Sequence, residues 1–299
     1  MENKNIKIGA PTVKPKKSKL LLPHEKTAVQ VVILSVIIFC LLFSFLPLFL
    51  TVINSLKTDT QVQSNAFSFP LLSTMGQAIV QNFSIAWGAI GAFYFKTILI
   101  SLIGAICETI VGVALAYILS FKDFYFKDLV FLLFISVLLV PSIIGYPILV
   151  PFVRDTLGFG GNYVGYLIAM IGGSQVMGMF LFKTFFSQQP KSLYESASLD
   201  GANDFIILVK ITVPLALPII LYYFVGCFSG IYNEYLWASL ILDVDHKNLT
   251  QIMFSVSGES VKHGAMYAMY ILASIPLIIT TVISMKYFKS GEFAAGLKL

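Results

Sequence analysis

Long stretches without any charged residue constrain this chain more than any other feature of its sequence. A helix that crosses about 30 Å of hydrocarbon needs about 20 apolar residues. Five charge-free stretches are at least that long, and they occupy residues 27–56, 129–153, 156–182, 211–233 and 264–285. Charged residues make up only 12% of the chain, whereas about 25% is usual for a protein that must cover a soluble surface. The sequence therefore predicts a membrane protein.

A sixth stretch, at residues 97–120, is interrupted only by Glu108 and is also long enough to span a bilayer. All six runs are continuous and much longer than the alternating segments of about ten residues that form transmembrane strands. We therefore expect an all-α polytopic membrane protein with six transmembrane helices.

Prolines and small residues add detail to the third and fourth helices. The third, at 129–153, should be kinked or broken in its outer half by three prolines. They are Pro141, Pro147 and Pro151. The fourth, at about 162–182, carries small residues at helical spacing, which predicts close packing against a neighbouring helix. They are Gly165, Ala169, Gly172 and Gly173.

The lysines and arginines are distributed unevenly between the two sides of the predicted membrane. If both termini are cytoplasmic, all but five of the 20 basic residues fall in cytoplasmic segments. The five on the outer side are Lys57, Lys96, Arg154, Lys247 and Lys262. This asymmetry obeys the positive-inside rule and predicts that both termini are cytoplasmic. The net charge of +5 therefore reflects topology, and we expect no nucleic-acid partner.

These features divide the chain into segments. The basic residues 1–26 are expected to form a disordered cytoplasmic arm rather than a cleaved signal peptide, because the apolar run that follows is too long for one. The rest comprises a first transmembrane helix (27–56), an extracytoplasmic segment (57–92), a core with helices two to six (93–286) and a cytoplasmic tail (287–299). Within the extracytoplasmic segment, the semi-apolar residues 75–92 are expected to lie on the membrane surface.

The polar stretch at residues 183–213, between the fourth and fifth helices, has room for structure of its own. Pro190 suits the first turn of a helix, and Ser192-x-x-Glu195 has the spacing of a capping box. Gly201 suits the end of that helix. Asn203 or Asp204 could then cap a second helix that runs from residue 205 toward Pro214. The sequence predicts a helix, a glycine turn and a second helix on the cytoplasmic face.

Several kinds of chemistry are not indicated. The dipeptide Gly-Lys of a phosphate-binding loop does not occur, so ATP would have to be bound and hydrolysed by partner subunits. Three histidines give no metal-binding spacing. The three cysteines, Cys40, Cys107 and Cys227, lie inside predicted spans and are read as small apolar fillers. We expect no catalytic residue, metal or cofactor, and therefore no enzyme.

Residues 190–218 resemble the EAA loop of ATP-binding-cassette importer permeases. The matching elements are Glu195-Ser196-Ala197, Asp200-Gly201-Ala202, Pro214 and Pro218, with Ser196 and Val213 standing where alanine and leucine are usual. Other segments resemble the MalG-like permeases of the carbohydrate branch. They are Ser55-Leu56-Lys57, Asn82-Phe83, Tyr232 to Trp237 and the tail from Lys286 to Gly296. The outer loop after the fifth helix and Glu108 are less typical of that group.

The resemblance implies a type I, MetI-like permease fold in a bacterial-type inner or plasma membrane. The permease would pair with a second homologous permease, two ATPase subunits and an extracytoplasmic solute-binding protein, and would import a sugar or oligosaccharide. The EAA helix would couple it to the ATPase. In that role Ser196, Ala197 and Ala202 would let the helix enter a groove on the ATPase, Glu195 would pair with a basic group there, and Asp200-Gly201 would set the turn.

Polar residues within the spans are candidates for the solute pathway, because an ionisable group in a membrane needs a partner or an aqueous cavity. Glu108 and Glu234 are the ionisable candidates, and packing is the alternative role for Glu108. A second set lies at helical spacing and is predicted to form one face of the fifth helix. It comprises Tyr222, Gly226, Ser229, Gly230, Asn233 and Trp237, with Tyr232 beside it. That face could line a carbohydrate path or simply pack against another helix.

Three other functions compete with a sugar permease. A permease for a non-sugar solute such as a peptide, polyamine, metal or phosphonate would share the EAA loop. A secondary transporter should show an inverted repeat and paired charges inside the membrane, and an intramembrane enzyme should show catalytic pairs within helices. The sequence shows the EAA loop and neither of the last two patterns.

Overall fold

The computed structural model describes residues 25–257 and 261–288. The chain divides into two compact units, residues 1–49 and residues 50–299. The expected arm at 1–26 and tail at 287–299 therefore lie almost wholly outside the described residues. In the first unit, helix α1 (Glu25–Ser55) runs up to Phe49, and its side chains from Val29 to Phe49 are exposed. A helix that is apolar on all sides and exposed along its length is suited to lipid.

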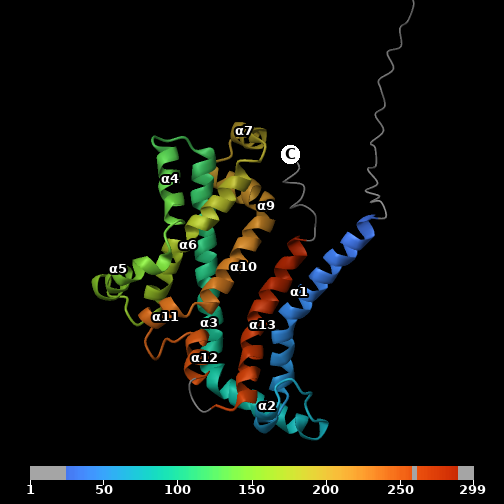
Figure 1. Ribbon diagram of the computed structural model, residues 1–299. Coiled ribbons are helices and arrows are strands. Elements are labelled where there is room, and N and C mark those ends of the chain that lie inside the picture. The colour runs from blue at the N-terminus through green and yellow to red at the C-terminus, as the bar shows by residue number, and fades with distance from the viewer. Residues whose placement is uncertain (1–24, 258–260, 289–299) are drawn as a thin grey trace, which may run out of the picture. The chain divides into compact units, whose positions relative to one another are not determined.

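The second unit is built around one very long helix, α3 (Leu72–Phe121). Three further helices lie against it: α6 (Tyr163–Phe186), α10 (Leu217–Asn233) and α13 (His263–Phe288) (Figure 1). The largest hydrophobic cluster joins these helices and includes Ile90, Phe182, Phe186 and Phe228. Polar and small residues of α3, such as Ser101 and Gly104, are buried among them. Among the described residues there is no β-strand, only an isolated bridge between Gly161 and Leu242.

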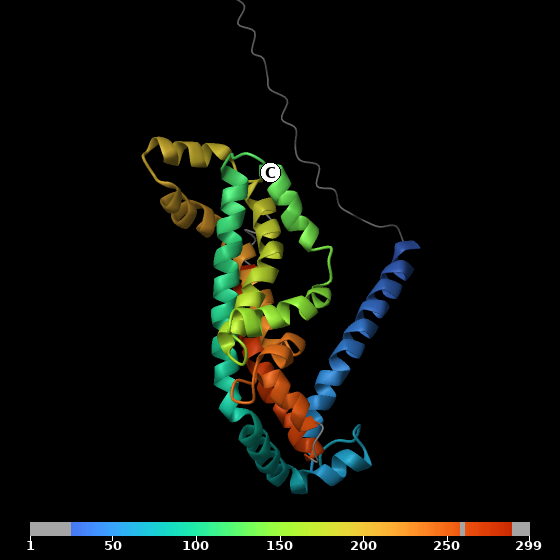
Figure 2. The same cartoon turned by 90° about the vertical axis from the view of Figure 1, so that its left-hand side faces the viewer.

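Helix α3 runs across the expected boundary between the outer segment and the core. The expectation was a transmembrane helix at 97–120 preceded by a separate surface stretch at 75–92. The structure instead runs both through a single helix of 50 residues without interruption at residue 92. No proline or capping residue lies between them to end a helix. The N-terminal part of α3 bends away from the rest of the helix in Figure 2.

The short helix α2 (Asp59–Ser64) joins α1 to α3 through a buried polar cluster. The Lys57 ammonium is fully buried and donates to Asn54 Oδ1 at 2.9 Å and to the carbonyls of Asn65 and Ala66 at 3.2 and 3.0 Å. Asn82 of α3 donates to the Lys57 carbonyl at 2.8 Å. Burial lowers the pKa of Lys57. Two segments singled out in the sequence, 55–57 and 82–83, therefore meet in space.

The third predicted span is broken as its prolines suggested. Helix α4 (Lys127–Val137) ends before Pro141, and a short helical turn η1 (Ser142–Gly145), helix α5 (Tyr146–Pro151) and a π-helical turn η2 (Phe152–Thr156) follow. The two halves meet at an angle of 93°. Proline lacks the amide donor that a helix interior needs, so this prediction is confirmed by the break at 138–141.

The fifth predicted span, at 211–233, begins later than expected. Residues 204–215 form α8 (Asp204–Ile207), a π-helical turn η3 (Leu208–Thr212) and α9 (Val213–Leu215). At Ala216 the chain turns by 83° into α10. Pro214 and Pro218 flank this bend and explain it, because each removes a helical hydrogen bond. The start of the predicted span therefore belongs to the preceding helix, and α10 begins at Leu217.

Helix α10 is followed by α11 (Leu236–Ile241) and α12 (Leu249–Ser257) before α13. Four helices among the described residues are long and apolar enough to cross a membrane, within α1, α3, α6 and α13. The two bent pairs raise the number to six if each pair is one span. A number between four and six is consistent with the six transmembrane helices expected from the sequence.

Close packing occurs at two of the four predicted small residues of α6 and at a further glycine. Gly165 is buried against Phe159, and Ala169 packs against the cluster that contains Ile231 and Trp237. A Cβ added to Gly112 of α3 would lie 3.5 Å from the backbone of Gly178 in α6, so these two helices touch backbone to backbone. Gly178 also faces the ring of Tyr223. Gly172 and Gly173, which were expected to pack, have no atom within 4 Å of an added Cβ. The prediction therefore holds for Gly165 and Ala169 and fails for Gly172 and Gly173, and the contact face of α6 also includes Gly178.

Candidate functional site

The predicted helix, glycine turn and second helix form at residues 190–207. Helix α7 (Lys191–Leu199) starts after Pro190, and Gly201 has a φ of +82°. The amide of Gly201 donates to the Ser198 carbonyl at 3.1 Å, and the next amide, of residue 202, donates to the Ala197 carbonyl at 3.0 Å. This is the Schellman end of a helix, in which glycine adopts the left-handed conformation without strain.

The N-cap of the first helix, α7, differs from the predicted one, and the N-cap of the second helix agrees with the prediction. The N-cap of α7 is Pro190, which has no side-chain hydrogen bond, so Ser192 lies within the first turn and the capping box with Glu195 does not form. Asn203 caps α8, and its Oδ1 accepts from the Ile206 amide at 2.9 Å. We call residues 190–215, from α7 through α9, the coupling element.

The side chains of α7 separate into a buried face and a free face. Tyr194 is buried, and Ala197 and Ala202 pack against the main hydrophobic cluster. These two alanines were expected on the docking surface; both are partly buried and contact the core of their own chain, and their part in docking stays a prediction. Glu195, Ser196 and Asp200 are exposed as expected.

Sequence reasoning missed two large apolar side chains on the free face. Leu199 is 89% exposed and Phe205 is 72% exposed, and they flank the Gly201 turn. The signal was available, because an apolar residue immediately before a glycine turn and another just after the next N-cap cannot both pack inward in so short a connection. A soluble surface rarely carries two such residues next to each other without a partner.

The coupling element is attached to the end of α3 by rings and by one carboxylate. The ring of Tyr194 lies 4.1 Å from that of Phe121. Asp204 Oδ1 accepts from Lys122 Nζ at 2.6 Å and from the Tyr117 hydroxyl at 3.3 Å. A polar cavity of about 680 Å³ surrounds these groups.

A second cavity, of about 560 Å³, opens between α3, α6, α10 and α13. We call it the bundle cavity. Its lining is mostly apolar, with Glu108, Ser174, Tyr223 and Thr281 among its polar groups. The Glu108 side chain is 1% exposed, and its Oε1 has no hydrogen-bond partner among the described residues. A buried carboxyl oxygen without a partner is costly, and such groups mark functional positions in membrane proteins.

The predicted face of the fifth helix is only partly present. Residues 222, 226, 229 and 230 line the bundle cavity. Asn233 lines a different cavity, of about 340 Å³, and donates to the Ser229 carbonyl at 2.9 Å. Trp237 is not on this face, because α10 ends at Asn233 and Trp237 belongs to α11. Its side chain is 1% exposed, and its Nε1 donates to the Tyr166 carbonyl at 3.0 Å.

The remaining pathway candidates have evident structural contacts. Glu234 Oε1 accepts from the Trp237 amide at 2.8 Å and so holds the first turn of α11. Tyr232 is buried, and its hydroxyl donates to the Ala273 carbonyl at 2.9 Å. The break after Asn233 turns residues 234–237 away from the face that continuous helical spacing predicted.

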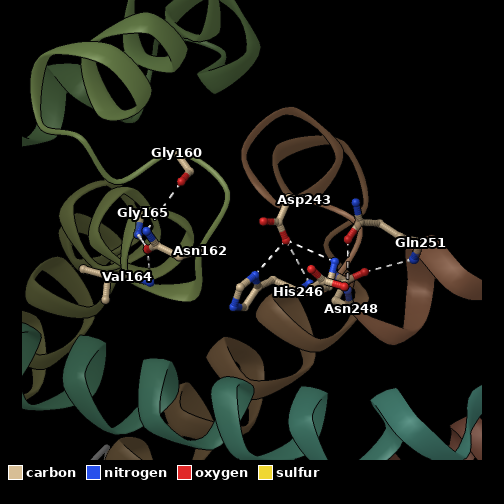
Figure 3. A network of polar contacts seen from close by, with 9 residues as sticks. Gly160, Asn162, Val164, Gly165, Asp243, His246, Asn248 and Gln251 are labelled. Atoms are coloured by element: carbon tan, nitrogen blue, oxygen red, sulfur yellow. Dashed lines mark hydrogen bonds and ion pairs between the residues drawn. The ribbon is translucent and has the colours of Figure 1, made fainter.

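Two groups of hydrogen bonds lie at the start of α6 and in the loop after α11 (Figure 3). The Gly161 amide donates to the Ile241 carbonyl at 2.8 Å, and Asn162 caps α6. Asp243 Oδ1 lies 2.7 Å from His246 Nδ1, and this hydrogen bond lowers the pKa of Asp243. Asn248 and Gln251 exchange hydrogen bonds between side chain and amide, both at 2.9 Å, and so begin α12.

No group of three or more histidine, cysteine, aspartate or glutamate side chains that could hold a metal ion occurs within the part of the chain that the structure describes. Cys227 is buried, Cys107 is partly buried and Cys40 is exposed on α1. The geometry therefore offers two candidate functional features. One is the coupling element with its exposed face, and the other is the bundle cavity.

Comparisons with known proteins show the family and the fold of the chain. The family model "Binding-protein-dependent transport system inner membrane component" matches residues 108–291. The melibiose/raffinose/stachyose import permease protein MelC of Bacillus subtilis is 27% identical over 85% of this chain and 91% of its own length. The trehalose/maltose transport system permease protein MalG of Thermococcus litoralis is 28% identical over 69% of this chain and 75% of its own length.

A solved structure shares the fold. A chain of a bacterial ABC transporter involved in the import of the acidic polysaccharide alginate superposes with a TM-score of 0.75 at 21% identity. The match covers 90% of this chain and 99% of that one.

Proposed function

Because the chain belongs to the family of binding-protein-dependent transport system inner membrane components, we propose that it is the permease of an importer for a sugar or oligosaccharide. The family is one of multi-pass membrane permeases that work with ATPase subunits and a solute-binding protein. The solute class, the number of partner subunits and the roles of particular residues in this chain are our proposal.

The observation that carries the permease assignment is the coupling element. A helix ended by a glycine turn presents Glu195, Ser196 and Leu199 on a free face, while its other face is packed on the core. We propose that this free face and Phe205 dock on a cytoplasmic ATPase subunit. Exposed apolar residues beside a carboxylate suit an apolar groove with a basic rim. We propose that both chain termini are cytoplasmic, an orientation that the distribution of basic residues supports.

A sugar is the solute class that we favour. Both relatives described above carry saccharide names, and tyrosine rings with small polar groups in the bundle cavity suit sugar rings and hydroxyls. We propose that a second, homologous permease faces this cavity and completes the pathway, and that two ATPase subunits supply the energy. A permease for a non-sugar solute is the alternative, since it would use the same coupling element.

The assignment of solute is tested by calorimetry with the solute-binding protein that works with this permease. Titration with a panel of mono- and oligosaccharides, peptides, polyamines and phosphonates should give saturable heat for a saccharide only. Uptake of that saccharide by proteoliposomes containing the whole transporter should then require ATP inside. Heat with a peptide or polyamine alone would establish the alternative.

The pathway is tested at Glu108 and Asn233. Glu108→Gln keeps the shape of the side chain and removes its ionisation, so we expect altered uptake kinetics with normal assembly. Asn233→Leu removes the amide from the neighbouring cavity. Thr250 lines the same cavity and donates to the Tyr232 carbonyl at 3.1 Å. Thr250→Val therefore controls for the loss of a polar group from this cavity at a position other than Asn233. If Glu108→Gln and Asn233→Leu both match wild-type kinetics, the solute contacts belong to the partner permease.

A further inference from the structure

The coupling element makes few contacts with the long helix α3, and one of them is the ion pair between Asp204 and Lys122. We propose that Asp204, held by Lys122 and Tyr117, is a clamp that makes the coupling element move together with α3. This inference rests on the function proposed above, because it assigns positioning residues to the step that links ATP hydrolysis to movement of the permease.

The clamp joins the ends of two helices. Lys122 is the C-cap of α3, and its amide still donates to the Ile118 carbonyl at 3.0 Å. Asp204 is the first residue of α8, directly after the Asn203 cap. A carboxylate is favoured at a helix N-terminus and a lysine at a helix C-terminus, so each partner also suits its own helix end. One oxygen, Asp204 Oδ1, accepts from both Lys122 and Tyr117.

Tyr117 connects the clamp to the buried core. Its side chain is buried, and its ring lies 5.1 Å from the Phe121 ring, which in turn lies 4.1 Å from the ring of Tyr194 on α7. Phe121 also stacks on Phe186 at the end of α6. The coupling element thus meets the end of α3 through Tyr194 on α7 and through Asp204 at the start of α8, while Ala197, Ala202 and Ile207 pack in the main hydrophobic cluster. The clamp is the polar part of this attachment.

The energetics explain why the clamp serves positioning more than folding. The side chains of Lys122 and Asp204 are 45% and 59% exposed, and exposed ion pairs contribute little to the stability of a fold. A movement of the ATPase can shift the conformational equilibrium of the permease only through contacts that keep a fixed geometry between the two. When Asp204 is released, we expect α8 and the Gly201 turn to follow the ATPase without α3.

A neighbouring lysine supplies a matched control. Lys127 lines the same polar cavity, but its Nζ pairs with Asp123 at 3.3 Å, four residues earlier in the chain. This pair does not reach the coupling element. Removing Lys127 therefore changes the charge of the cavity as Lys122→Ala does, and leaves the clamp intact.

The test uses the complete transporter in lipid nanodiscs, with its ATPase subunits and its solute-binding protein. The ATPase rate is measured with and without the binding protein, and the amount of co-purified ATPase subunit is measured on the same samples. Lys122→Ala, Asp204→Asn and Tyr117→Phe should keep wild-type amounts of ATPase subunit. Stimulation by the binding protein should fall about fivefold or more in the first two variants and less in the third. Lys122→Arg and Lys127→Ala should behave as wild type.

A double reversal, Lys122→Asp with Asp204→Lys, should recover at least half of the stimulation that Lys122→Asp loses. Wild-type stimulation in both Lys122→Ala and Asp204→Asn would overturn the clamp. So would loss of the ATPase subunits from these variants, because the residues would then belong to the docking surface. If the wild-type complex itself binds no ATPase subunit or shows no stimulation, the proposed function fails instead.

Discussion

The turn at Gly201 offers the sharpest perturbation of the coupling element. Its φ of +82° lies in the left-handed region, and no atom lies within 4 Å of an added Cβ. A side chain there meets no obstacle within the chain, so the cost of Gly201→Val is the backbone cost alone. For a residue other than glycine this is about 1–2 kcal/mol, and a β-branched side chain stands at the upper end.

The consequence for docking follows from that figure. If the ATPase binds only the formed turn, a penalty of about 1–2 kcal/mol lowers its affinity by up to about 5- to 30-fold. Gly201→Asn is the matched variant, because asparagine tolerates the left-handed region, and it should lose much less. The assay is titration of detergent-solubilised or nanodisc-bound permease with labelled ATPase subunit, together with uptake by the reconstituted complex.

The reasoning predicts the order wild type, Gly201→Asn, Gly201→Val in both affinity and uptake, with equal membrane insertion of all three. Equal affinities for wild type and Gly201→Val would refute the claim that the formed turn is what the ATPase recognises.

Three further expectations concern other parts of the chain. Trp237→Ala should destabilise the protein by about 3–5 kcal/mol in thermal unfolding, because it empties a buried site and removes the hydrogen bond to Tyr166, and unchanged unfolding would show that α11 repacks. A cysteine at Ser192 should resist an impermeant thiol reagent added to intact cells, and labelling from outside would reverse the proposed orientation. The hydrogen bond to His246 lowers the pKa of Asp243, so the stabilising effect of this bond should be present above the ordinary aspartate pKa and be lost as the pH falls through the lowered value. His246→Ala should return the pKa of Asp243, measured by NMR, toward the ordinary value. An unchanged pKa would exclude this cause.

The sequence was most informative where local chemistry decides the structure. The prolines at 141, 147 and 151 predicted a broken third span, and the glycine at 201 with the asparagine at 203 predicted the turn and cap of the coupling element. These predictions succeeded because a missing amide donor or a positive φ is a property of a few neighbouring residues.

The errors arose where distant parts of the chain decide the outcome. The face of the fifth helix was extended to Trp237 by helical spacing, but the helix ends at Asn233 and a contact with Tyr166 fixes Trp237. Ala202 and Ala197 were chosen for a docking surface because their side chains are short, and a short side chain also permits the packing on the core that the structure has, so sequence alone does not separate the two roles. The clamp at Asp204 could not be predicted, since its partners lie more than 80 residues earlier in the chain.

The central claim is that the free face of α7 contacts the ATPase. It is tested most directly by placing a photo-crosslinking amino acid at Leu199, or at Val244 as a control, in the assembled transporter. Both side chains are highly exposed, at 89% and 72%, and Val244 lies in the loop after α11. Illumination should join position 199 to the ATPase subunit and leave position 244 unjoined to it. A crosslink to the ATPase from position 244 with none from position 199 would contradict the account.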